Sequence, residues 1–161
     1  MINEQVAQKL ETQFPGAVIV QEEPVEDCIM LTSDQWQDVA KFLRDDPELK
    51  FDSLQCITGV DLGDENPMDV RYNLHSMSLL HKIEIRIPVK KDNPTIPSIE
   101  KIWRIGDWFE REVYDMYGIR FEGHRDLRRM LLPEDWEGWP LRKDYETPQT
   151  YHGMVVPKVK S

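Results

Sequence analysis

The chain has little cysteine and little histidine for its 161 residues. Its two cysteines, Cys28 and Cys56, lie far apart in apolar runs, and its four histidines form no HxxxH or HExxH pair. An iron–sulfur cluster needs about four cysteine ligands, and a structural zinc needs four cysteines or histidines at set spacings. We therefore predict that this chain alone binds no metal and no cluster, and that both cysteines are buried free thiols.

Long apolar runs are missing as well. No stretch of about 18 apolar residues is present, so no membrane-spanning helix is predicted. The N-terminal segment contains acidic residues and lacks an apolar core, which is not typical of a secretory signal. We expect a chain on the cytoplasmic side that reaches a membrane only through its partners.

An excess of basic residues is also absent, because the formal net charge is −10. Residues 1–100 contain 9 lysines and arginines against 19 aspartates and glutamates, whereas residues 101–161 contain 11 of each kind. Nucleic acids and anionic lipids both require a basic footprint. The composition therefore argues against both, and a solvated acidic face is the simplest interpretation of the first 100 residues.

Apolar periodicity indicates the secondary structure. Apolar residues at spacings of three and four predict three helices. The first covers residues 2–14, the second follows a capping box formed by Thr32 and Gln35, and the third covers residues 105–117. Alternation over 70–75 and 82–89 predicts an antiparallel hairpin. Shorter strands are expected over 17–21, 28–31 and 51–60, and a short helix over 98–103.

This order of elements predicts an α+β fold, in which helices pack on one face of an antiparallel β-sheet. Residues 1–120 form the α+β part of a single domain, and residues 121–161 form an irregular C-terminal strap that binds a partner. The helix over 105–117 is expected to bury one apolar face, to pair Arg111 with Asp115, and to end at Gly118 in the left-handed conformation. The predicted apolar face consists of Ile105, Phe109, Val113, Met116 and Tyr117.

The segment after this helix is rich in arginine and aromatic residues. Six cationic residues within 24 positions alternate with tryptophan, tyrosine and acids: Arg120, Arg125, Arg128, Arg129, Arg142 and Lys143. Arginine and aromatic residues are enriched at the energetic centres of protein interfaces, which favours an interface here. The alternative is that the arginines pair with acids of the same domain and hold the loop in place.

An enzyme is a second alternative. His124 and nearby carboxylates have the chemistry of general acids and bases. However, the sequence contains no nucleophile elbow, no glycine-rich phosphate loop and no metal triad. Glu110 and Glu112 can equally be acids at a helix N-terminus, where the helix dipole favours them.

Four stretches resemble the signature of the C subunit of the proton-pumping NADH:quinone oxidoreductase, respiratory complex I. They are EREVYDMYGI, Gly123–His124, LRRMLLPEDWEG and PLRKDY. Three positions depart from the pattern: Arg125 and Glu146 replace common prolines, and Trp139 replaces a histidine. A tryptophan at position 139 resembles the sequence of the J subunit of the photosynthetic relative. That relative takes electrons from ferredoxin.

The resemblance implies a subunit that binds no cofactor itself, within a complex that uses NADH, FMN, iron–sulfur clusters and quinone. Its implied partners are the D-like large subunit of the quinone site and the B- and I-like cluster-bearing subunits, on the cytoplasmic face of the inner membrane. The alternative is the same scaffold role in a relative fed by ferredoxin or another donor. The interface positions that it implies, together with Trp136, are Glu110, Arg111, Glu112, Asp115, His124, Arg128, Arg129, Pro140, Leu141, Arg142, Lys143, Asp144 and Tyr145.

Overall fold

The computed structural model describes residues 3–20, 28–63 and 66–156, and its centre is a four-stranded sheet. The strands lie in the order β1 (Cys28–Met30), β4 (His81–Val89), β3 (Met68–Ser76) and β2 (Ser53–Asp61). The pairs β2–β3 and β3–β4 are antiparallel, and β1 runs parallel to β4. The predicted hairpin is confirmed, with Tyr72 opposite Ile85.

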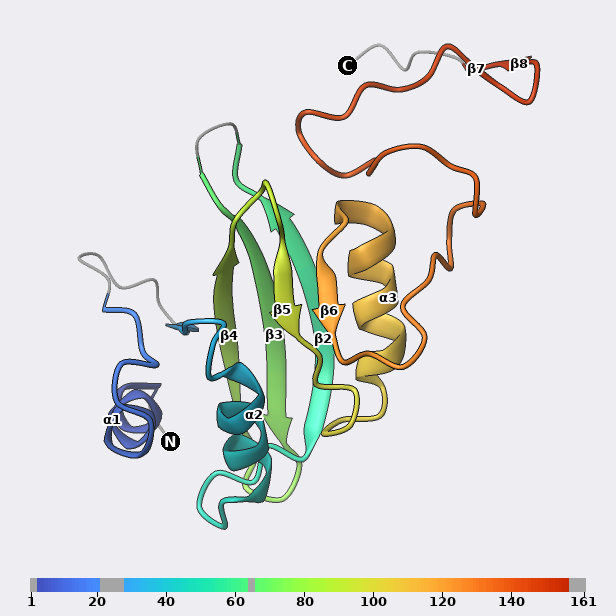
Figure 1. Ribbon diagram of the computed structural model, residues 1–161. Helices are drawn as coiled ribbons and strands as arrows, with labels where there is room; N and C mark the ends of the chain where they lie inside the picture. Colours follow the sequence, from blue (N-terminus) through green and yellow to red (C-terminus); the bar gives the residue numbers. More distant parts are fainter. Residues whose placement is uncertain (1–2, 21–27, 64–65, 157–161) are drawn as a thin grey trace.

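The helices and two short strands cover one side of this sheet (Figure 1). Helix α2 (Trp36–Asp45), helix α3 (Gly106–Tyr117) and the parallel pair of β5 (Thr95–Pro97) and β6 (Arg120–Glu122) lie on this side. Helix α1 (Asn3–Gln13) lies beside β1 at the edge of the sheet. This arrangement confirms the predicted α+β class.

The core lies between the sheet and its covering elements. Alternate residues of β3 and β4 point into it, so Tyr72 and Ile85 are fully buried. Trp36 of α2 packs on Tyr72 with ring centroids 4.6 Å apart. Burial of one such large apolar side chain stabilises a fold by roughly 1.5–3 kcal/mol. The polar residues that alternate with them, among them Asn73 and Glu84, lie on the opposite face of the sheet.

Two local predictions are wrong. Helix α2 begins at Trp36, and its N-cap residue Gln35 makes no side-chain capping bond. Thr32 does not cap the helix, because the N-cap position falls three residues later, on Gln35. Residues 98–103 form turns and irregular backbone rather than the predicted helix, and the backbone N–H of Ile99 donates to the side chain of Glu110 in α3.

The remaining differences concern short segments. The strand predicted over residues 17–21 is one antiparallel bridge between Val18 and Leu31. From the sequence, an acidic turn is expected over residues 22–27, which lie outside the described residues. Strand β6 crosses the predicted boundary at residue 120. The tail contains a small hairpin of β7 (Thr150–Tyr151) and β8 (Met154–Val155). Neither cysteine forms a disulfide with a residue that the structure describes, and both are half-buried rather than buried.

Across the described ranges, every helix is too short or too polar to cross a membrane.

Candidate functional site

The buried side of α3 contains two fully buried acids in addition to the predicted apolar residues, of which Val113 is buried and Phe109 and Tyr117 pack against the core. The side chains of Glu110 and Asp115 are fully buried beside Val113, whereas Ile105 is 47% exposed. Buried carboxylates are tolerated only where hydrogen bonds or cations compensate them. Each of the two therefore organises the backbone around it.

Asp115 holds the loop that follows α3. One carboxylate oxygen accepts the backbone N–H groups of Met130, Leu131 and Leu132 at 3.0, 2.7 and 3.0 Å. The other oxygen forms an ion pair with Arg129 at 2.8 Å. Burial raises the pKa of Asp115, but these hydrogen bonds outweigh it, so the pKa lies below the usual value. Asp115 is thus an ionised anchor for an otherwise irregular segment.

Arg129 extends this anchor to the next part of the loop. It donates to the carbonyls of Asp115, Trp136 and Gly138 at 2.9–3.0 Å, and its guanidinium lies 4.5 Å from the ring centroid of Trp139. The predicted pair between Arg111 and Asp115 is not formed. Arg111 instead donates to the backbone carbonyls of residues 128 and 129 at 3.3 Å.

Residues 139–145 fold back onto the end of α3. The ring of Trp139 lies against Gly118, which ends the helix at φ 73°, as predicted. The backbone N–H of Leu141 donates to the carbonyl of Met116 at 3.1 Å. Arg142 donates through Nε to the carbonyl of residue 117 at 2.6 Å. The last carbonyl groups of α3, which have no partner within the helix, thus accept hydrogen bonds from residues 141 and 142.

A second network surrounds the start of α3. Glu110 accepts the hydroxyl of Ser98 at 2.6 Å and the backbone N–H of Ile99 at 2.7 Å. Burial raises the pKa of Glu110 to about 7, although both hydrogen bonds act in the opposite direction. The carboxyl group therefore fixes the turn before α3 and titrates near neutral pH.

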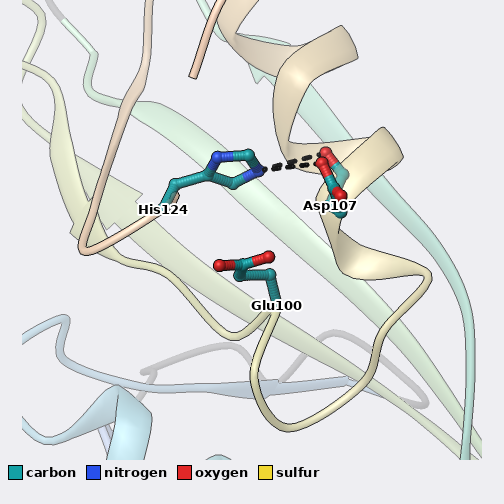
Figure 2. Close-up of side chains that lie close together, drawn as sticks. All are labelled: Glu100, Asp107 and His124. Atoms are coloured by element: carbon teal, nitrogen blue, oxygen red, sulfur yellow. Dashed lines mark hydrogen bonds and ion pairs between the residues drawn. The ribbon is translucent and has the colours of Figure 1, made fainter. Parts of the chain in front are cut away.

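His124 also lies at the start of α3, where its ring faces Asp107 (Figure 2). Its Nδ1 accepts the backbone N–H of Asp126 at 3.1 Å, so we assign its proton to Nε2. Nε2 lies 3.2 Å from the carbonyl oxygen of Asp107 and 3.4 Å from its carboxylate. The His124 side chain is fully buried, which leaves a substrate no access to the ring. This geometry fits a structural histidine better than a general base.

Glu100, Asp107 and His124 offer ligand atoms within 4.8 Å of one another. The sequence did not predict this grouping, because the three residues come from separate segments. Arg125 donates to Asp107 and lies 3.3 Å from Glu100, and Arg104 lies 3.2 Å from Glu100. Two guanidinium groups thus already balance the charge that would attract a cation, so we interpret the cluster as an ion-pair network.

The other predicted positions are Glu112, which lies on α3, and residues of the loop. Glu112, Arg128 and Asp144 are exposed, and Arg128 pairs with the neighbouring Asp126 at 2.9 Å. Trp136 packs on Tyr151, with ring centroids 5.1 Å apart. Several signature residues line an open hollow of about 330 Å³: Trp139, Arg142, Asp144 and Tyr145, together with Glu137, Gly138 and Glu146. Pro140 is half-buried, and Leu141 is 52% exposed.

Comparison with solved structures defines the class of protein first. The trypsin-resistant fragment of Nqo5 superposes with a TM-score of 0.64 at 25% identity, covering 79% of this chain and 100% of that one. A chain of a membrane-bound sulfane sulfur reductase, an archaeal respiratory membrane complex, superposes with a TM-score of 0.70 at 23% identity. That match covers 89% of this chain and 85% of the other. The fold is therefore one that occurs in a respiratory membrane complex.

Sequence comparison identifies the family. The model of the respiratory-chain NADH dehydrogenase 30-kDa subunit matches residues 29–151. The C subunit of NADH-quinone oxidoreductase from Chlorobium phaeobacteroides is 48% identical over 129 residues, covering 80% of this chain and 78% of that protein. Its counterpart in Roseiflexus castenholzii is 42% identical over 144 residues, covering 88% and 83%. The chain belongs to the 30-kDa subunit family of respiratory complex I, and so to a hetero-oligomer.

Proposed function

We propose that this chain is a structural subunit of the peripheral arm of complex I that binds no cofactor itself. Its family membership and the irregular loop of residues 123–145 support this role. In the proposed complex, other subunits hold the FMN and the iron–sulfur clusters that carry electrons from NADH to quinone while protons are moved. The chain contacts the D-like quinone-site subunit and the B- and I-like cluster-bearing subunits, on the cytoplasmic face of the membrane.

The observation that carries this proposal is a rigidly held loop with apolar residues on its outer side. Asp115 and Arg129 fix the backbone from within, yet Leu131 and Leu141 are 58% and 52% exposed. An irregular loop that is already ordered loses less conformational entropy when a partner binds. Burying two leucines at an interface then stabilises the complex instead of the isolated chain.

The loop also carries the residue types of an interface centre. The hollow beside Trp139 contains arginine and tyrosine side chains, which are enriched among residues that dominate binding energy. Arg142 uses its Nε for the carbonyl of residue 117, so the rest of its guanidinium is available to a partner carboxylate. The two interpretations of the arginines are therefore compatible. Arg129 and Arg142 hold the loop in place from within the chain, and Arg142 is also placed to bind a partner.

Substitution of the exposed leucines tests the interface. Leu131→Asp and Leu141→Asp should leave the unfolding midpoint of the isolated chain unchanged, because both side chains face solvent. Each should lower the yield of assembled complex by about tenfold or more, since a buried charge opposes docking. Val20→Asp is the matched control, because Val20 is 91% exposed and distant from the loop in sequence. Equal yields from all three variants would contradict the proposal.

Arg142→Ala is expected to weaken assembly by removing a charged anchor. From the sequence, Lys91→Ala is a silent control, but the structure contradicts this choice. Lys91 forms an ion pair with Asp61 at 2.8 Å and also donates to the carbonyl of Gly63. Lys41→Ala, on the exposed side of α2, is the better control.

The electron donor and the enzyme alternative are tested by purification from native membranes. Recovery of a flavin subunit with NADH-oxidising activity supports NADH as the donor. Recovery of the quinone-site partners without that module indicates ferredoxin or another donor, as Trp139 suggests. A free-standing enzyme requires that the chain is recovered alone, and that His124→Ala lowers an activity without affecting assembly.

A further inference from the structure

The face of the sheet opposite α2 and α3 carries an unfavourable arrangement of cations. Arg71 of β3 lies directly opposite Arg86 of β4. Like charges directly opposite each other destabilise an antiparallel pair. These cations lie within residues 1–100, the acidic part of the chain, so general composition does not account for them.

The acids on this face compensate the cations only in part. Arg71 pairs with Asp69 at 3.5 Å, and Arg86 pairs with Glu84. Lys82 is exposed and forms no ion pair with any residue that the structure describes. The Nε of Arg71 is buried without a hydrogen-bond partner among those same residues. Three cations thus face two acids, and donor capacity remains unused.

The same face is hollowed. An open hollow of about 450 Å³ lies over β2, β3 and β4, and its polar lining consists of Gln55, Asn73, His75, Lys82, Glu84 and Arg86. Helices α2 and α3 and the β5–β6 pair lie on the other side of the sheet, and α1 lies at its edge (Figure 1). A hollow with cationic walls and amide side chains matches the size and chemistry of a few acidic side chains.

We propose that an acidic segment of a neighbouring protein subunit docks on this open sheet face, with a carboxylate at the unpaired ammonium group of Lys82. The inference rests on the proposed function, because the neighbour belongs to the same complex. Partner carboxylates would balance the opposed arginines, which explains why the chain keeps a pairing that weakens its own sheet. The net charge of −10 disfavours a nucleic acid as the occupant.

Carbodiimide cross-linking of the purified native complex tests the contact directly. The reagent joins a lysine amine to a carboxylate within contact distance as an amide, and mass spectrometry identifies the joined peptides. The expected product links Lys82 to an aspartate or glutamate of another subunit. Cross-linking only to a second copy of this chain, or no cross-link from Lys82, overturns the proposal.

A charge reversal provides the second test. Lys82→Glu places an acid opposite His75, so the unfolding midpoint of the isolated chain should stay unchanged. Assembled complex should fall by about tenfold or more, because like charges then meet at the interface. Lys41→Glu, the same charge change on the covered side, should have less than about a twofold effect.

Normal assembly of Lys82→Glu overturns the docking site alone. Failure of the wild-type chain to purify with any complex removes the proposed function as well.

Discussion

The backbone N–H of Lys143 donates to the carboxylate of Asp61 at 2.9 Å, a hydrogen bond between residues 82 apart in the chain. The same carboxylate accepts the N–H of Gly63 at 3.0 Å and pairs with Lys91 at 2.8 Å. The strap is therefore fastened to the end of β2, at a point where three donors meet one buried acid. Burial raises the pKa of Asp61, but these donors lower it by more, so the pKa falls below its usual value to about 2.

Asp61→Asn should destabilise the chain in a pH-dependent way. Because the folded pKa lies below the ordinary value of 3.8, the carboxylate stabilises the fold above pH 4 and loses this effect as pH falls toward 2. We expect a loss of roughly 2 kcal/mol at pH 7. Urea unfolding across this range measures it, with exposed Asp92→Asn as the control. A pH-independent difference would show that charge is not the cause.

Asp115→Asn should release the loop of residues 129–139. The substitution removes the ion pair with Arg129 and leaves that guanidinium partly buried without its anion. Breaking a buried pair costs about 3–5 kcal/mol, so both global stability and protection of the loop from proteases should fall. Exposed Glu112→Gln, on the same helix, should change neither. Slow proteolysis of the loop in Asp115→Asn would contradict the anchoring role.

Glu110→Gln should alter how stability depends on pH. A carboxyl group whose pKa is raised to about 7 holds its proton in the folded state, so wild-type stability should decline as pH rises from about 4.5 to 7. Glutamine keeps an acceptor for Ile99 and has no charge to bury. Between pH 5 and pH 8, the free energy of unfolding of the variant should rise relative to that of the wild type by up to roughly 3 kcal/mol. Parallel stability profiles for both proteins would refute this role of Glu110.

Gly118→Ala should be costly for two separable reasons. The position has φ 73°, which strains a residue with a Cβ, and the added Cβ would lie 2.5 Å from the Trp139 ring. Gly123→Ala isolates the strain, because Gly123 has φ 81° with nothing within 4 Å of its Cβ position. We expect a loss of about 1 kcal/mol at Gly123 and clearly more at Gly118. In a Trp139→Ala background the two losses should become similar.

The fold was predictable where it depends on local pattern. The alternation of Tyr72 and Ile85 with polar neighbours located the central hairpin, because a strand exposes alternate side chains to opposite faces. Gly118 located the end of α3, because a left-handed residue at a helix end is usually glycine. The signature located the irregular loop and the family to which it belongs.

The candidate site was less predictable, because its partners are distant in sequence. Asp115 and Glu110 are buried, although the helical periodicity leaves both outside the predicted apolar face. Their burial makes sense only once the N–H groups of residues 99 and 130–132 are placed beside them. The role of Asp61 likewise depends on tertiary structure, since no local pattern connects it with Lys143.

The fastening of the strap also sets an order of events during synthesis. A ribosome delivers the chain from its N-terminus, so Asp61 and the sheet leave the exit tunnel well before Lys143 does. Until then the loop lacks its last attachment. The interface proposed for this loop would therefore be completed only after the domain beneath it, so an unfinished chain would not present it.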